Sequence, residues 1–120
     1  MHRFFVPIAA LLLTAAPTAV SASYALAQGV TEDADLVLWC ASAYAQLAND
    51  ASEKSDVIET ELYDEMAAAL TQRGIELLRA RKIEDERIGA IIQAYDDEVY
   101  IQLGTPSARY PVENCEPLAS

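Results

Sequence analysis

The sequence predicts an all-α protein, a small three-helix up-down-up bundle with an irregular C-terminal tail stapled back by one disulfide. Three observations predict this fold. Apolar residues recur at helical spacing throughout the chain beyond residue 30, and no segment there alternates like a strand. Pro and Ser crowd the tail at 104–120, which forbids a long helix there. Cys40 and Cys115 supply the two thiols for a disulfide.

The start of the chain has the layout of a cleavable signal peptide. A positive start with Arg3 precedes an apolar run at 4–16, and Ala25, Leu26 and Ala27 form a small-residue cleavage site. An uncleaved anchor is the alternative, but spanning a bilayer takes about 20 apolar residues and the run at 4–16 holds only 13. We therefore expect cleavage, and no membrane span after it. The predicted organisation is a signal peptide at 1–27, a helical bundle at 28–103 and a tail at 104–120. The predicted location is the periplasm or the exterior.

Cleavage after Ala27 would leave 93 of the 120 residues, which is the size of one small domain. It would remove His2, the only histidine, together with Arg3, so 19 acidic side chains would face 7 basic ones. Phosphate groups bind Lys and Arg, and a formal charge of about −12 repels them. Nucleic-acid partners are therefore not expected.

Export would carry Cys40 and Cys115 into an oxidising compartment, where they are expected to form one disulfide. Closing a loop of about 75 residues stabilises a fold by about 4 kcal/mol in the chain-entropy model. A redox pair and a metal site are the alternatives. There is no C-x-x-C, however, and structural zinc takes four N or S ligands. No metal or cofactor is expected.

The first helix is expected to open at Thr31, whose side chain can cap it, and to end at 49–52. Its predicted buried face consists of Leu36, Val37, Cys40, Ala43, Tyr44, Leu47 and Ala48. Leu38 and Trp39 lie beside this face. Either the returning tail covers them or they form an exposed apolar patch, so they are the candidate protein-binding surface.

The second helix is expected to begin near Asp56, which with Glu59 resembles a capping box, and to end near 82–85. Gly74 is expected to lie inside it, since one glycine costs a helix only about 1 kcal/mol. The predicted buried stripe is Ile58, Leu62, Met66, Ala69, Leu70 and Leu77. Arg73 falls within this stripe, so we expect it to pair with a carboxylate or to reach water; a ligand-binding arginine is the alternative.

The third helix follows the acidic turn at 84–86 and is expected to stop at Gly104. Ile83 and Ile88 are spaced like a hydrophobic staple. Its predicted buried stripe is Ile88, Ile91, Ile92, Tyr95, Val99 and Leu103.

The tail is expected to run back along the bundle until Cys115 meets the middle of the first helix at Cys40. An extended chain of 11 residues beyond Gly104 spans up to about 36 Å, which is long enough. Tyr110 and Leu118 are expected to pack beside the bridge.

No set of residues in the sequence forms a recognisable active site. With His2 removed by the predicted cleavage and both thiols in a disulfide, triad and thiol mechanisms lack their parts. The acidic segments at 50–65 and 96–98 lack the glycine-centred spacing of a calcium loop and are interpreted as solvated helix faces.

The function expected is that of a non-catalytic protein-binding module of the bacterial cell envelope, with another envelope protein as its partner. The first alternative is a periplasmic stress-type holdase that loosens in acid when its carboxylates are protonated. The second alternative is an enzyme that uses carboxylates only. No oligomeric state is predicted.

Overall fold

The computed structural model describes residues 29–119, and the predicted signal peptide lies outside them. This part of the chain is helical and contains no strand. Three long helices are followed by two single-turn helices: α2 (Glu32–Glu53), α3 (Val57–Ala80), α4 (Asp85–Gln102), η2 (Val112–Cys115) and α5 (Glu116–Ala119). The predicted all-α fold with a disulfide-tied tail is confirmed.

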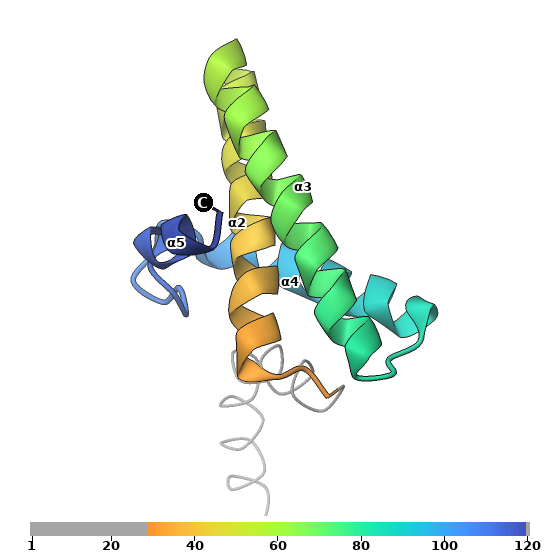
Figure 1. Cartoon of the computed structure of the whole chain (residues 1–120). Helices are drawn as coiled ribbons and strands as arrows, with labels where there is room; N and C mark the ends of the chain where they lie inside the picture. Colours follow the sequence, from red (N-terminus) through yellow and green to blue (C-terminus); the bar gives the residue numbers. More distant parts are fainter. Residues whose placement is uncertain (1–28, 120) are drawn as a thin grey trace, which may run out of the picture.

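The helices α2 and α3 form an antiparallel hairpin, and α4 crosses behind α2 (Figure 1). α4 packs mainly on α2 and touches α3 little. The tail with η2 and α5 lies beside the middle of α2, so α2 contacts α3, α4 and η2. The end of the hairpin that carries the α2–α3 link projects beyond both α4 and the tail (Figure 1).

The ends of the helices follow the predicted capping residues. The Thr31 side chain accepts a hydrogen bond from the Ala34 amide at 3.3 Å, and Asp56 accepts one from the Glu59 amide at 3.0 Å. Each bond satisfies one of the amides that a helix start leaves without a partner. Between α3 and α4, Ile83 is buried, as expected of a staple residue.

The core is centred on α2. Five of the seven residues of its predicted face are buried, and Leu36 and Leu47 are half-buried. The predicted stripe of α4 is buried at Ile88, Ile91, Tyr95 and Val99 and half-buried at Ile92 and Leu103. Gly74 lies inside α3, as predicted, where α3 approaches α2 closely. A Cβ atom at Gly74 would lie 2.5 Å from Cδ2 of Leu38, so any larger residue there would force this leucine to shift.

The predicted buried stripe of α3 is partly wrong. Leu70 is buried, and Met66 and Leu77 are half-buried, but Ile58, Leu62 and Ala69 are exposed. The face that packs on α2 is instead Ala67, Leu70, Gly74 and Leu78. The physical reason is that α3 has α2 on one side only, and no other described element covers the opposite side of its first turns.

Candidate functional site

The disulfide joins the tail to the middle of α2. Cys40 and Cys115 are bonded, with their Cα atoms 5.5 Å apart across a separation of 75 residues. Both side chains are buried. The predicted pairing is confirmed, and it holds η2 against the middle of α2.

A polar cluster beside the disulfide attaches the tail a second time. Arg109 of the tail donates to both carboxylate oxygens of Asp35 on α2, at 2.7 and 3.0 Å, and also to Glu98 on α4. Tyr95 and Tyr110 each donate a hydroxyl hydrogen bond to Asp35. Asp35 and Glu98 are buried. One guanidinium thus connects α2, α4 and the tail.

The surroundings of Asp35 set its protonation. Burial alone would raise the pKa of this carboxyl group, but the hydrogen bonds from Arg109, Tyr110 and Tyr95 outweigh burial and hold the pKa below its ordinary value. Burial and the bond to Asp35 raise the pKa of Tyr110 to about 12, and they raise the pKa of Tyr95 as well. Asp35 is therefore ionised and both tyrosines are neutral at pH 7. With four hydrogen bonds accepted by one carboxylate, the cluster is arranged to hold the tail.

Leu38 and Trp39 do not form the predicted surface. Trp39 is 0% exposed and Leu38 is 2% exposed. The ring of Tyr110 stands edge-on to Trp39 at 5.6 Å between centroids, and α3 covers Leu38 at Gly74. Cover by the returning tail, the alternative for Trp39, is what the structure shows, and Tyr110 packs at this position as expected.

Arg73 does not lie in the core, because it sits on the exposed side of α3. Its Nη1 atom donates to the backbone carbonyl of Leu118 at 3.5 Å. Arg73 thus reaches water, which was one of the two expected outcomes, and it contacts the backbone of α5 in place of a carboxylate.

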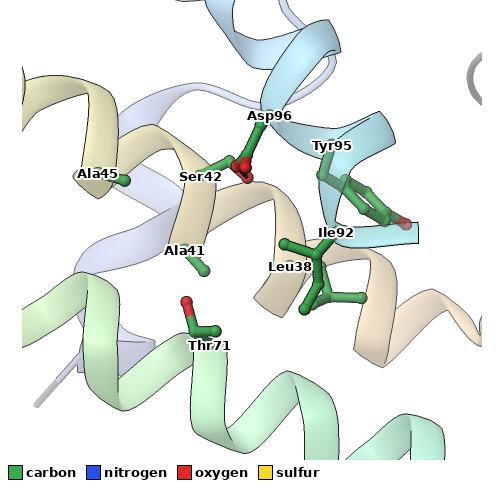
Figure 2. Close-up of a pocket in the computed structure, with 8 residues that line it drawn as sticks. All are labelled: Leu38, Ala41, Ser42, Ala45, Thr71, Ile92, Tyr95 and Asp96. Atoms are coloured by element: carbon green, nitrogen blue, oxygen red, sulfur yellow. Dashed lines mark hydrogen bonds between the residues drawn. The ribbon is translucent and has the colours of Figure 1, made fainter. Parts of the chain in front are cut away.

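A small cavity lies between α2, α3 and α4 (Figure 2). Its volume is about 140 Å³, which is large enough to admit water. Ser42 donates to Asp96 at 2.6 Å on one side, and the Thr71 side chain projects into the space from α3. No histidine lies within residues 29–119 to activate the Ser42 hydroxyl as a nucleophile. The cavity is suited to water or a small polar molecule.

The described part of the chain, residues 29–119, offers neither a metal-ion cluster nor a membrane-spanning helix. Within it, no three His, Cys, Asp or Glu side chains are grouped so that they could hold a metal ion. No helix there is both long enough and apolar enough to span a bilayer.

Large apolar side chains are exposed in two places. The first, which we call the tip patch, consists of Val57, Ile58 and Leu62 on the first turns of α3, with exposed fractions of 66%, 82% and 47%. An open hollow of about 250 Å³ adjoins Val57. The second, the α4 patch, consists of Tyr100 and Ile101, each 74% exposed. Ile58 and Leu62 of the tip patch carry an apolar signal in the sequence, but helical spacing alone does not show whether such a signal belongs to the core or to an exposed face.

The chain matches no protein-family model, no curated protein and no solved structure.

Proposed function

We propose that the protein is a non-catalytic module of the bacterial cell envelope that is exported and binds another protein through the tip patch. The observation that carries this proposal is the exposure of Ile58 and Leu62, one helical turn apart on the same side of α3. The buried disulfide supports export, because such bonds form and persist in oxidising compartments.

The tip patch is not needed by the fold. α3 packs on α2 through a different face, and the apolar side chains at 58 and 62 keep most or about half of their surface in water. Apolar groups that gather on a projecting surface are typical of interaction sites. The place of the patch on the projecting end of the hairpin leaves it open to a partner (Figure 1).

Affinity recovery from envelope extracts tests the proposal. Tagged wild-type protein, the pair Ile58→Ser and Leu62→Ser, and the control pair Tyr100→Ser and Ile101→Ser are compared by quantitative mass spectrometry. We expect one or a few envelope proteins to be recovered with the wild type and the control and to be lost with the tip variant. If the wild type, the tip variant and the control recover the same envelope proteins in equal amounts, the tip patch is not the binding surface.

A holdase is the second candidate, and the Asp35 cluster is the observation that favours it. Protonation of Asp35 in strong acid would weaken the bonds from Arg109 and Tyr110 that keep the tail over Trp39. The disulfide would still tether the released tail. Aggregation of an acid-sensitive client protein between about pH 2 and 4 tests this function. If the wild type does not reduce the aggregation of the client over this pH range, the holdase function is eliminated.

A further inference from the structure

Carboxylates frame the tip patch. Ile58 and Leu62 lie on one side of α3, and by helical spacing Glu59 and Glu61 fall to either side of this pair, while Glu65 lies at its far end. All three glutamates are exposed. Asp56 caps the near end.

The acidic character extends across the whole tip of the hairpin. Residues 50–65 hold seven carboxylates, and Lys54 is their only basic residue. The ion pairs of Arg79 with Asp85, and of Arg109 with Asp35 and Glu98, lie away from this tip. Its negative charge is therefore available to a partner.

The helix dipole explains only part of this arrangement. A carboxylate in the first turn of a helix stabilises it, which accounts for Asp56 and Glu59. Glu61 and Glu65 lie beyond that turn, where the effect of the dipole has fallen off. The helix dipole does not explain why two large apolar side chains, Ile58 and Leu62, lie exposed between these carboxylates, and packing in the core does not explain it either.

Resting on the proposed function, we infer that the tip patch receives a positively charged segment of another protein, in which apolar anchors are flanked by Lys or Arg. Apolar anchors would cover Ile58 and Leu62, and basic side chains would lie over Glu59, Glu61 and Glu65. A second copy of the chain would bring the same carboxylates together, and an anionic membrane would repel them. Charge complementarity thus selects the basic segment over these two occupants.

Selection from a displayed library of random peptides of about 15 residues, four helical turns, tests the inference with the purified, oxidised protein. We expect enriched peptides to carry apolar residues with net positive charge. Their binding should fall about tenfold or more when salt is raised from about 0.05 to 0.5 M, since exposed ion pairs are screened. Enriched peptides that are neutral or acidic, or an absence of enrichment, would overturn the inference.

Two variants separate the apolar and the charged contributions. The pair Ile58→Ser and Leu62→Ser should abolish enrichment. Glu61→Gln with Glu65→Gln should keep the apolar preference but reduce the net charge of the selected peptides. The α4 pair Tyr100→Ser and Ile101→Ser serves as the control and should select the same peptides as the wild type. Identical selections by the wild type and the glutamine variant would contradict the role of the carboxylates.

The outcomes distinguish this inference from the proposed function. If an envelope protein is recovered through the tip patch but the displayed peptides show no positive charge, the inference fails and the protein-binding function stands. If no recovery depends on Ile58 and Leu62, the proposed function fails. Dimerisation that the tip variant abolishes would identify a second copy as the occupant and would overturn the inference.

Discussion

The two ends of the α2–α3 hairpin are built on opposite principles. At the end shared with α4 and the tail, even the charged groups Asp35 and Glu98 are buried, and Arg109 pairs with both. At the projecting end, the apolar side chains of Ile58 and Leu62 face outward. The buried ion pairs of the first end stabilise the fold, whereas the exposed apolar side chains of the second end do not. The difference indicates that stability and binding are located in separate regions of this molecule.

The largest effect is expected from Arg109→Ala. The change would leave the carboxylates of Asp35 and Glu98 without their cation, and breaking a buried pair in this way costs about 3–5 kcal/mol. Arg109 is 26% exposed, so water will screen part of the loss, and we expect a loss of about 2–3 kcal/mol in the free energy of unfolding. Urea denaturation of the oxidised protein measures it.

Arg79→Ala is the matched control for Arg109→Ala. Arg79 pairs with Asp85 at 3.3 Å, but the two side chains are 57% and 77% exposed. Exposed pairs contribute about 0–1 kcal/mol. Equal losses in the two variants would mean that the cluster at Asp35 does not hold the tail.

The two helical glycines offer a second comparison within the stable region. Gly74→Ala would force a methyl group against Leu38, and overpacking of this kind costs about 1–3 kcal/mol. Gly89 lies at an exposed position of α4, where an added Cβ atom would meet no atom within 4 Å, so Gly89→Ala should stabilise the fold by up to about 1 kcal/mol through helix propensity. Thermal unfolding of both variants checks the opposite signs. A stabilising Gly74→Ala would show that α2 and α3 do not approach closely there.

The pH dependence of stability should follow the groups around Asp35. Because its folded pKa lies below the ordinary 3.8, the stabilisation is present above that value and is lost as pH falls through the folded pKa. Tyr110, with its pKa raised from 10.0 to about 12, contributes stability that is present below pH 10 and lost as pH rises through about 12. Unfolding midpoints across pH measure both limbs. Tyr110→Phe should flatten the alkaline limb, and an unchanged limb would contradict the assignment.

The smallest effect on stability is expected at the tip patch. Ile58→Ser with Leu62→Ser removes side chains that the fold leaves in water, so the free energy of unfolding should change by no more than about 0.5 kcal/mol per substitution. Urea denaturation beside the wild type measures it. A loss of 2 kcal/mol or more, the scale of a buried side chain, would show that the patch belongs to the core.

The sequence predicted the helices well because their caps and apolar spacing are local signals, as at Thr31 and Asp56. It predicted the wrong face of α3 because Ala67 and Gly74, which pack on α2, are small and carry little hydrophobic signal. Ile58 and Leu62 have a strong signal but lie where no described element covers them.

The cluster at Asp35 was missed for a different reason. Its members come from three parts of the chain, and Tyr95 and Arg109 lie 60 and 74 residues beyond Asp35. The spacing of residues along one helix does not predict contacts between residues that lie so far apart in the sequence. The disulfide could be predicted because only two thiols were present to pair.

Site-specific photo-cross-linking in cells tests most directly whether the tip patch is the binding surface. A photoreactive amino acid is placed at position 62 in one variant and at position 101 in another, and adducts are identified by mass spectrometry. We predict a discrete adduct with one envelope protein from position 62 and none from position 101. Equal adducts from both positions, or an adduct from position 101 alone, would contradict this account.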